Sequence, residues 1–592
     1  MKPKTVTSQG NGFFLKNLLK VLIDEEGGVS VKIKGAEILL RALSDEGVDT
    51  IFGYPGGVVL DIFDEIYKSK FKHILVRHEQ GAAHAADGYA RASGKVGVCL
   101  VTSGPGATNT VTGIATAYMD SIPIVVFTGQ VATPLLGSDA FQEADITGIT
   151  RPCTKHNFIV RKVEDLARTV KEALYIARSG RPGPVLVDIP KDVSQAMTEY
   201  HESGPPKAPA HDPIYVPDVT ALNEALRMIK QAKKPVVMVG GGVILGKASQ
   251  ELREFIEKVQ IPVTHTLMGI GAFPGTDPLS LGMPGMHGTY YANMALTQCD
   301  LLINIGARFD DRVTGKLDEF AKNAKIIHID IDAASINKNV IVDLPIVSDC
   351  KSALQQLNKM LLQNHFTIPE KDRKAWTQQI DEWKEYAPLS YCAGEKIKPQ
   401  CVIETIYKLT KGDAIIATEV GQNQMWAAQF YKFNHPNTFL SSGGLGTMGY
   451  GFPAAIGAQI AFPDKTVVDI AGDGSIQMNI QELATAVVYN IPVKICILNN
   501  GFLGMVRQWQ EIFYERRYSH TNISQIPDFV KLAEAYGAVG LRATKPEEME
   551  AILEKGLNTP GPVIMDIHVE PEEGVYPMVR PGSPISDMDL GR

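Results

Sequence analysis

Two polar residues, Asp473 and Asn500, lie 27 positions apart, and each follows a continuous apolar run that ends in a turn. The runs are 466–471 and 493–498, and both predict buried parallel strands that end at one edge of a sheet. Carboxylate, amide and carbonyl oxygens, completed by phosphate oxygens and water, satisfy the octahedral coordination of Mg²⁺. The spacing therefore predicts a site at which magnesium joins the protein to a diphosphate.

The stretch that follows Gly472-Asp473-Gly474, residues 476–488, has helical spacing. A diphosphate would lie at the N-terminus of that helix, where free N–H groups and the positive dipole end favour an anion. Asp473 would repel this anion unless a divalent cation lay between them. Glycine turns and Asn-Asn pairs also end strands in many α/β proteins, so either half alone would be weak evidence for a site.

A third candidate is Glu79, in the run His78-Glu79-Gln80-Gly81-Ala82 after the apolar residues 74–76. This position predicts a carboxyl group in the first turn of a helix that is poor in bulky residues. An acid there also stabilises the helix dipole without any catalytic role, and both interpretations stay open on the residues alone.

The elements that must position these residues belong to a long chain in which short motifs containing glycine and proline occur twice. Gly104-Pro105-Gly106, Ile122-Pro123 and residues 182–189 recur in the same order as 472–474, 491–492 and 560–567. The recurrence predicts two α/β domains of like topology. Strand patterns at 235–239, 301–305 and 326–331 predict a third, middle domain. We expect three doubly wound parallel-sheet domains with these bounds: an N-terminal extension at 1–31, domains at 32–200, 218–364 and 398–592, and linkers at 201–217 and 365–397.

Composition sets further limits. The 592 residues carry a net charge of −8, which argues against nucleic acid as a partner. Seven scattered cysteines form no CxxC pair, which favours a reducing compartment and no structural zinc. No apolar run reaches membrane-spanning length, and residues 1–31 match neither a signal nor a transit peptide. We expect a cytoplasmic protein whose extension is a tail or a short added helix.

The Gly-Asp-Gly and Asn-Asn pair resembles the signature of the thiamine diphosphate enzymes. Longer segments resemble the acetohydroxyacid synthase (acetolactate synthase) family, catalytic large subunit, from about residue 31 to 588; they are 139–145, 306–315, 442–451 and 504–510. The resemblance implies decarboxylation of pyruvate to a hydroxyethyl carbanion on the cofactor. The carbanion then attacks a second pyruvate, giving 2-acetolactate, or 2-ketobutyrate, giving 2-aceto-2-hydroxybutyrate, in branched-chain amino-acid biosynthesis.

The resemblance assigns Glu79 to the aminopyrimidine ring of thiamine diphosphate, which it would activate by proton exchange. That task needs a carboxyl group sheltered from water, so that its pKa rises. The ring pocket would be completed by Tyr54, Pro55, Gly56 and Gly57. In this family the first domain of one subunit faces the third domain of another, so the resemblance implies a homodimer or homotetramer with sites at the interface.

From the third domain the resemblance implies a second set of cofactor contacts. These are Val420, Gln422, Gln424, Gly446, Met448, Gly472, Asp473, Gly474, Ser475, Asn500 and Met505, with Asp473, Asn500 and Phe502 as the magnesium ligands. Met448 matches the residue that bends the cofactor into a V, although a methionine there would serve equally as core filler.

Two residues match the family's pocket for the second keto acid. Arg312 offers a planar fork for the acceptor carboxylate, and Trp509 shapes the acceptor pocket. The alternatives are an ion pair of Arg312 with Asp310 or Asp311, and an ordinary aromatic on an amphipathic helix. On the donor side the resemblance implies Gln142, with Lys191 at the rim.

The resemblance also implies FAD in the middle domain, although the overall reaction transfers no electrons. Three glycines after the strand at 235–239 would let the backbone approach a pyrophosphate, and an acid after 326–329 would take a ribose hydroxyl. The implied contacts are Arg181, Gly240, Gly241, Gly242, Thr266, Leu267, Met286, His287, Gly306, Arg308, Asp310, Arg312, Val313, Asp330, Ile331 and Asp349.

Two other interpretations stay open. One is a thiamine-flavin oxidase or decarboxylase, which has no second keto acid to hold and so no use for Arg312 and Trp509. The other is a cofactor-binding scaffold without turnover, which the joint presence of Glu79, Asp473 and Asn500 argues against. The resemblance further implies a separate regulatory small subunit as a partner. Nothing in this chain resembles that subunit, so we expect any feedback regulation to reside on another chain.

Overall fold

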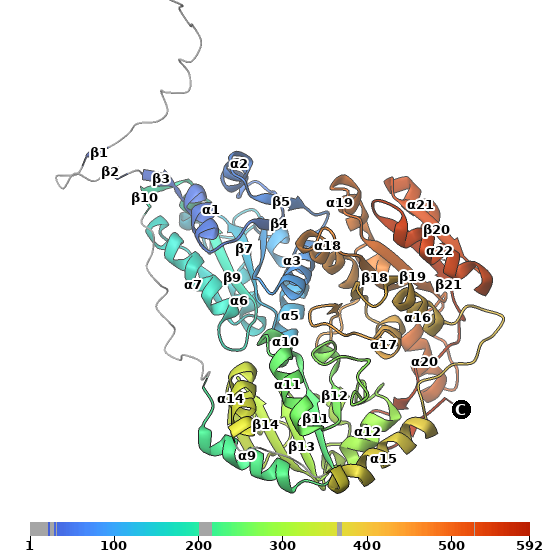
Figure 1. Cartoon of the computed structure of the whole chain (residues 1–592). Coiled ribbons are helices and arrows are strands. Elements are labelled where there is room, and N and C mark those ends of the chain that lie inside the picture. Colours follow the sequence, from blue (N-terminus) through green and yellow to red (C-terminus); the bar gives the residue numbers. More distant parts are fainter. Residues whose placement is uncertain are drawn as a thin grey trace, which may run out of the picture.

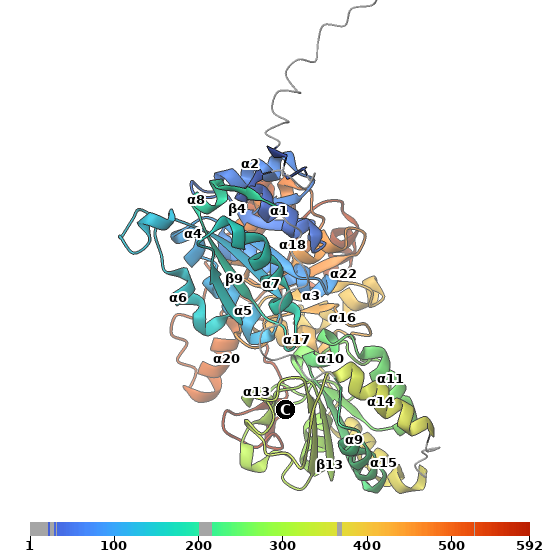
Figure 2. The same ribbon diagram turned by 90° about the vertical axis from the view of Figure 1, so that its left-hand side faces the viewer.

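The computed structural model describes residues 22–23, 29–30, 32–200, 216–363, 370–525 and 527–591. They form three α/β domains, each built on a parallel sheet, as expected. The first and third domains lie side by side, and the middle domain lies beneath them in the view of Figure 1. Figure 2 shows the same arrangement from the side, with the middle domain extending away from the other two.

The first domain carries a six-stranded sheet in the order β5-β4-β6-β7-β9-β8, all parallel. Its strands are β4 Thr50–Tyr54, β5 Lys72–Leu75, β6 Gly97–Val101, β7 Ile124–Gln130, β8 His156–Ile159 and β9 Val185–Pro190. Its helices are α1 Gly35–Asp45, α2 Leu60–Lys68, α3 Glu79–Ser93, α4 Pro105–Thr108, α5 Val111–Asp120, α6 Ile146–Thr150, α7 Leu166–Arg178 and α8 Lys191–Gln195. A short antiparallel pair, β3 Lys32–Lys34 with β10 Met197–Glu199, joins the domain's two ends.

The third domain repeats this topology, since its sheet runs β17-β16-β18-β19-β21-β20. Its strands are β16 Ile415–Thr418, β17 Phe439–Leu440, β18 Val467–Gly472, β19 Lys494–Asn499, β20 Val539–Ala543 and β21 Val563–His568. Its helices are α16 Pro399–Thr410, α17 Gln422–Phe430, α18 Gly451–Ala461, α19 Leu483–Val488, α20 Gly504–Phe513, α21 Phe529–Tyr536 and α22 Pro546–Asn558. The strands correspond one to one in order, which confirms the internal repeat.

The middle domain has a five-stranded parallel sheet in the order β12-β11-β13-β14-β15. Its strands are β11 Pro235–Val239, β12 Val263–His265, β13 Leu301–Ile305, β14 Lys325–Asp330 and β15 Leu344–Val347. Its helices are α9 Val219–Gln231, α10 Gly241–Leu245, α11 Ser249–Val259, α12 Tyr290–Gln298, α13 Asp311–Thr314 and α14 Cys350–Gln363. The strand order reverses between β11 and β13, which is where ligands bind in open α/β sheets.

Two local expectations need correction. Residues 365–397, expected as a linker, include the helix α15 Glu370–Tyr386, which docks on the middle domain through buried Trp376 and Trp383. The indole of Trp376 donates to the carbonyl of Pro235 at 3.1 Å. In the N-terminal extension the structure describes only β1 Leu22–Ile23 and β2 Val29–Ser30, an antiparallel pair, and the rest of the extension, expected as a tail or a short helix, lies outside the described residues. The linker at 201–217 lies almost wholly outside the described residues.

The second correction concerns 476–488, expected as one helix. It consists of two 3₁₀ turns, Ile476–Met478 and Ile480–Glu482, and only then α19. Asn479 interrupts the helix with φ −135° and ψ 25°, and its side chain donates to the carbonyl of Gly449 at 2.6 Å. A diphosphate after Gly474 therefore meets a turn, and the dipole of a long helix does not contribute there.

The first and third domains pack together most extensively through α3 and α18 (Figure 1). Both helices are rich in glycine and alanine. A methyl group added at Gly88 would lie 2.2 Å from the carbonyl oxygen of Ala454, and one at Gly457 would lie 1.9 Å from that of Ala85. Only glycine permits this approach, so the boundary fixes the two domains relative to each other.

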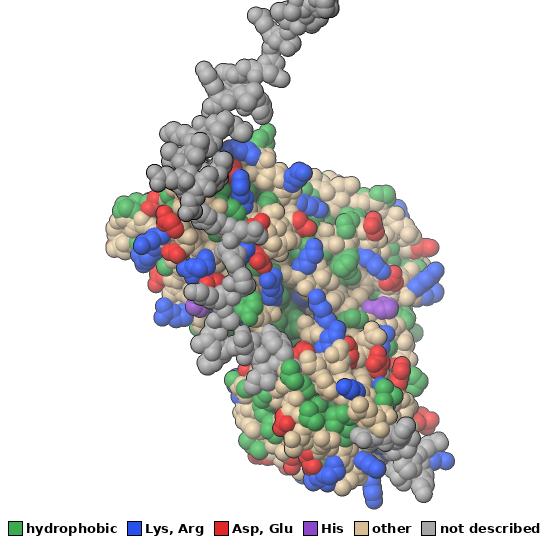
Figure 3. Space-filling model, turned by 60° about the vertical axis from the view of Figure 1, so that its left-hand side comes forward, with side chains coloured by type: hydrophobic (Ala, Val, Ile, Leu, Met, Phe, Trp, Pro, Cys, Tyr) green, Lys and Arg blue, Asp and Glu red, His purple; other side chains and the backbone are tan. Residues whose placement is uncertain are grey.

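The surface charge, the cysteines and the helix lengths can each be compared with the expectations from composition. On the face drawn in Figure 3, basic and acidic side chains are interspersed, and neither sign forms a continuous patch there. All seven cysteines are free thiols. Among the residues that the structure describes, no helix has the length and apolar character needed to span a bilayer.

Candidate functional site

Asp473 and Asn500 meet because their strands are neighbours. β18 pairs with β19 in parallel register, with Gly472 opposite Leu498, so both residues emerge at one edge of the sheet. The backbone N–H of Gly501 donates to Asp473 Oδ2 at 2.9 Å. Asn500 Oδ1 accepts from the N–H of Phe502 at 3.0 Å and keeps a second lone pair.

The environment of Asp473 suits a cation. The residue is 1% exposed, and burial raises the pKa of its carboxyl group to about 7, against the hydrogen bond from Gly501 that lowers it. A carboxylate buried in this way is stabilised when a positive charge arrives. Within the described part of the chain, no three His, Cys, Asp or Glu side chains form a metal site. A magnesium ion here would therefore rely on one carboxylate, amide and backbone oxygens, and phosphate.

A small cleft surrounds these residues, and it gathers most of the contacts expected from the third domain. The expected residues that line it are Val420, Gln422, Met448, Gly472, Asp473, Gly474, Ser475, Asn500, Phe502 and Met505. Gln422 links them: its Oε1 accepts from Asn500 at 3.3 Å, and its Nε2 donates to Gln508 at 2.9 Å.

Glu79 begins α3 on the first domain, as expected, after the N-cap residue His78. Its carboxyl group is half-buried and accepts from Asn109 Nδ2 at 3.0 Å. Around it lie the loop at Gly106, whose added methyl would be 3.4 Å from Glu79 Oε1, and Thr102, which packs against Gly56. The shelter expected for this acid is thus only partly supplied by its own chain.

The other expected first-domain residues lie near this acid or along the same sheet edge. Tyr54 ends β4 and is exposed, and Gly57 has open space beside it. Gln142 has a left-handed backbone, φ 58°, and packs against Gly104, while Lys191 begins α8. Seven expected first-domain residues lie in neither of the two clefts described here: Tyr54, Pro55, Gly56, Gly57, Glu79, Gln142 and Lys191.

A much larger cleft, about 1730 Å³, opens where all three domains meet. Drug-sized pockets are roughly 300–1,000 Å³, so this one has room for a longer ligand. The expected residues that line it are Arg181, Gly241, Gly242, Thr266, Leu267, Met286, His287, Gly306, Arg308, Asp310, Arg312, Val313, Asp330, Ile331, Asp349, Val420, Gln424, Gly446, Met505 and Trp509. Val420 and Met505 line both clefts, so the two adjoin.

Of the three glycines after β11, Gly241 and Gly242 line this cleft, and Gly240 and Gly242 bond to the neighbouring strand end. The N–H of Gly240 donates to the carbonyl of Ile305, and that of Gly242 donates to Gly306, each at about 3 Å. Both N–H groups are therefore used within the protein. A methyl group on Gly240 would lie 2.1 Å from the Gly306 carbonyl, so these glycines permit close packing of the strand ends. Gly240 itself does not line the cleft.

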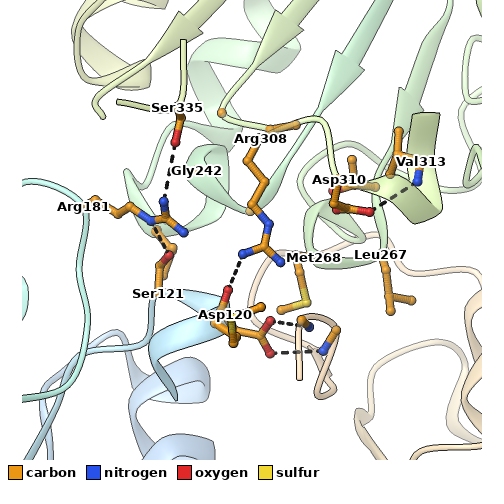
Figure 4. Close-up of a pocket in the computed structure, with 18 of the residues that line it drawn as sticks. Asp120, Ser121, Arg181, Gly242, Leu267, Met268, Arg308, Asp310, Val313 and Ser335 are labelled. Atoms are coloured by element: carbon orange, nitrogen blue, oxygen red, sulfur yellow. Dashed lines mark hydrogen bonds between the residues drawn. The ribbon is translucent and has the colours of Figure 1, made fainter. Parts of the chain in front are cut away.

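The cleft wall includes residues that the sequence did not single out. Figure 4 shows Arg181 pointing toward Ser121 and Ser335. Its Nε donates to Ser121 at 2.8 Å, and NH1 pairs with Asp332 at 3.0 Å. Asp332, two positions after the end of β14, was detectable as a second acid beside Asp330. Ser121, Met119 and Met268 carry no motif that would have marked them.

Arg312 and Trp509 face the same cleft from different domains. The side chain of Arg312 is 58% exposed, and its 3.7 Å ion pair with exposed Asp311 is too weakly held to fix it. Asp310 instead caps α13 by accepting from the backbone N–H of Arg312 at 3.0 Å. Trp509 is half-buried on α20, and its indole nitrogen is buried without a partner. The guanidinium group of Arg312 is thus available to a ligand, whereas Trp509 lines the cleft with its ring and not with its enclosed nitrogen.

Family models match each domain. Residues 33–149 match the N-terminal TPP binding domain of the thiamine pyrophosphate enzymes, 222–357 their central domain, and 419–567 their C-terminal TPP binding domain. The fold and the paired strand ends thus define a thiamine pyrophosphate enzyme, and thiamine diphosphate is the cofactor of this class.

Individual relatives narrow the assignment. The chain is 50% identical over 566 residues to the acetolactate synthase large subunit of Haemophilus influenzae, covering 95% of this chain and 99% of the relative. It is 49% identical over 567 residues to the acetolactate synthase isozyme 3 large subunit of Escherichia coli, with the same coverage. It is 51% identical over 574 residues to an acetolactate synthase of Mycobacterium bovis, covering 95% and 92%. The chain belongs to the acetolactate synthase large-subunit family.

Proposed function

We propose that this enzyme decarboxylates pyruvate on thiamine diphosphate and transfers the two-carbon unit to a second 2-keto acid. Pyruvate as acceptor yields 2-acetolactate, and 2-ketobutyrate yields 2-aceto-2-hydroxybutyrate. The observation that carries the proposal is the meeting of Asp473 and Asn500 at one sheet edge, in a domain that matches the C-terminal TPP binding model. Bound thiamine diphosphate supplies the carbanion centre and the electron sink for decarboxylation.

The protein's own residues have distinct tasks in this proposal. Asp473, Asn500 and the carbonyl of Phe502 would hold Mg²⁺, which would supply the positive charge that a diphosphate needs. Glu79 would hold the proton that is exchanged with the cofactor's ring. Arg312 orients the acceptor carboxylate with its planar fork, and Trp509 bounds the acceptor side chain. Gln142 and Lys191 border the donor side.

We further propose that each complete site needs two copies of the chain. Support comes from the distance between the two groups of expected residues. Glu79 and its neighbours line neither the small cleft around Asp473 nor the large cleft beside it. The half-buried state of Glu79 agrees, because a second copy that covered it would supply the missing shelter. The first domain of one subunit would then face the third domain of its partner.

FAD is proposed for the large cleft. Its fit rests on the size of the cleft and on Arg181, Arg308 and Asp330, which offer charged and hydrogen-bonding groups to a dinucleotide. The overall reaction needs no electron transfer, so FAD would serve there as a bound structural group.

A regulatory small subunit is also proposed, since the named relatives are large subunits. Seven free thiols support a cytoplasmic location.

The experiment is a product analysis. Purified protein would be incubated with pyruvate, thiamine diphosphate, Mg²⁺ and FAD, and the products identified by NMR. Acetolactate supports the proposal. Acetaldehyde or acetyl phosphate without acetolactate would indicate a decarboxylase or an oxidase, and no product at all would indicate a scaffold. Omitting Mg²⁺ or FAD in turn tests each of those cofactors separately.

A further inference from the structure

Asp120, the last residue of α5, lies buried where the three domains meet. Its side chain is fully buried, and it receives hydrogen bonds from three residues. Arg91 NH2 donates to Oδ2 at 2.8 Å, and Gly443 N–H donates to the same oxygen at 3.1 Å. Gly444 N–H donates to Oδ1 at 2.7 Å. Figure 4 shows the two carboxylate oxygens pointing at these backbone groups.

Arg91 on α3 is equally buried and holds a fixed orientation. Its Nε donates to Asp87 at 2.6 Å and its NH1 to the carbonyl of Ser441 at 2.8 Å. Its guanidinium group lies 5.2 Å from the ring centre of Tyr450, whose hydroxyl donates to Asp87 at 2.7 Å. One arginine between the two buried carboxylates of Asp87 and Asp120 leaves a net negative charge. The oxygens of Asp120 carry part of this charge and accept from backbone N–H groups of the third domain.

The backbone bonds converge on one loop, residues 441–450, which we name the 441–450 loop. Its contacts with the first domain run along its whole length, from the Ser441 carbonyl through Gly443 and Gly444 to the Tyr450 hydroxyl. Between them, the hydroxyls of Thr116 and Thr447 lie 2.7 Å apart. The loop has left-handed glycines at 446 and 449. Its own domain holds the second of these, since the N–H of Gly449 donates to Glu419 at 2.5 Å and Asn479 donates to the Gly449 carbonyl at 2.6 Å. The segment at Gly443 and Gly444 is bound instead from the first domain, by Asp120.

The loop has no room to move toward the first domain. A methyl group added at Gly444 would lie 2.8 Å from Met119 Cβ and 2.9 Å from both Arg308 NH2 and Asp120 Oδ1. Arg308 in turn donates to the Met119 carbonyl at 2.6 Å, which ties the proposed flavin cleft to the end of α5 (Figure 4). At Gly444 the loop therefore lies directly against residues of the two other domains.

We propose that Asp120 is a positioning residue, which with Arg91 holds the 441–450 loop so that Met448 and Gly446 face the cofactor. This inference rests on the proposed function. The chemistry is electrostatic: a buried carboxylate binds backbone N–H groups about twice as strongly as a neutral acceptor does. Reacting groups displaced by about 1 Å can lose about 100-fold in rate, so a loosened loop lowers kcat more than it lowers cofactor affinity.

The test compares Asp120→Asn with the full-length wild type. Asp413→Asn, which removes an exposed ion pair to Lys465, is the matched control. For Asp120→Asn we expect kcat per cofactor-loaded molecule to fall about 10- to 100-fold, with the KM for pyruvate and the Kd for thiamine diphosphate changed less than about fivefold. Hydrogen exchange of the peptide containing Gly443 and Gly444 should accelerate, and the control should match wild type in every measurement.

Two results would overturn the inference. One is an unchanged kcat per loaded molecule, which would mean that Asp120 only stabilises the fold. The other is unchanged exchange protection in the 441–450 loop. If Asp120→Asn does not fold, Arg91→Lys decides: it keeps the positive charge but loses the planar fork that binds Asp87, Asp120 and Ser441 together, and an unaltered kcat per loaded molecule would equally refute the role. A wild type that makes no acetolactate would refute the proposed function, while the exchange measurement would still test the loop.

Discussion

Replacing Asp473 by Asn should stabilise the cofactor-free protein while it abolishes metal-dependent cofactor retention. In the folded chain, burial raises the pKa of this carboxyl group from 3.8 to about 7. At about 1.4 kcal/mol for each pH unit, ionised Asp473 costs the folded state about 4 kcal/mol relative to the unfolded chain. Asparagine removes that cost and still accepts from Gly501. The weaker neutral hydrogen bond gives back about 1 kcal/mol, so the net gain is about 3 kcal/mol.

The gain depends on pH in a defined direction. Below about pH 4 the Asp473 carboxyl is protonated in both states and costs nothing. Between about pH 4 and 7 the unfolded chain releases its proton first, so wild-type stability falls as pH rises, and above about pH 7 the cost is complete. The advantage of the variant should therefore be about 3 kcal/mol at about pH 8 and about 1 kcal/mol or less at about pH 5.

The assay is calorimetric unfolding of protein freed of metal and cofactor, at both pH values. For a domain of 150–250 residues, each kcal/mol moves Tm by about 2–4 °C, so the variant should melt about 6–12 °C higher at about pH 8. Adding thiamine diphosphate and Mg²⁺ should raise the Tm of wild type and not that of the variant. Asp413 is an exposed aspartate in the same domain. Asp413→Asn should change neither the Tm of the cofactor-free protein nor the rise in Tm when cofactor and Mg²⁺ are added. A variant less stable than wild type at about pH 8, or an advantage independent of pH, would refute the reasoning.

Three further outcomes are expected. Glu79→Gln should lower kcat about 10²- to 10⁴-fold with little change in cofactor affinity, and acetolactate formation at the wild-type rate would contradict its role as the activating acid. Trp509→Leu should change the preference between 2-ketobutyrate and pyruvate by about 10- to 200-fold at most, measured in direct competition; an unchanged product ratio would remove Trp509 from the acceptor pocket. Gly457→Ala should destabilise the α3–α18 contact by about 1–3 kcal/mol in thermal unfolding, because the methyl would lie 1.9 Å from a carbonyl. Gly394→Ala, whose added methyl would meet only the Cε of Lys398 at 3.6 Å, is its control, and equal losses in the two would contradict the packing argument.

The fold was readable from the sequence because its signals are local. Uninterrupted apolar runs predicted both ends of β11 and β13 correctly. They predicted the ends of β18 and β19 to within one residue. The same glycine- and proline-containing motifs recur in both halves of the chain, and this recurrence predicted the repeated topology. Because parallel strands end at one sheet edge, the meeting of Asp473 and Asn500 followed from their positions alone.

Tertiary contacts decided what the sequence did not reveal. Asn479 breaks the expected helix at 476–488 by bonding to Gly449, 30 positions away. The helix α15 reads as a polar linker because only a few of its side chains, Trp376 among them, reach the core. The network around Asp120 joins residues more than 300 positions apart, and no spacing rule connects such residues. Buried networks of this kind have no periodicity to detect.

The close contact between α3 and α18 has a consequence for synthesis on the ribosome. The end of α3 at Ser93 and the start of α18 at Gly451 are 358 positions apart. At about 5–20 residues per second, the alanine-rich face of α3 would wait roughly 20–70 s for its partner helix to emerge. During that interval the nascent first domain presents an uncovered apolar surface, so chains terminated before about residue 460 should depend on chaperones and be degraded rapidly.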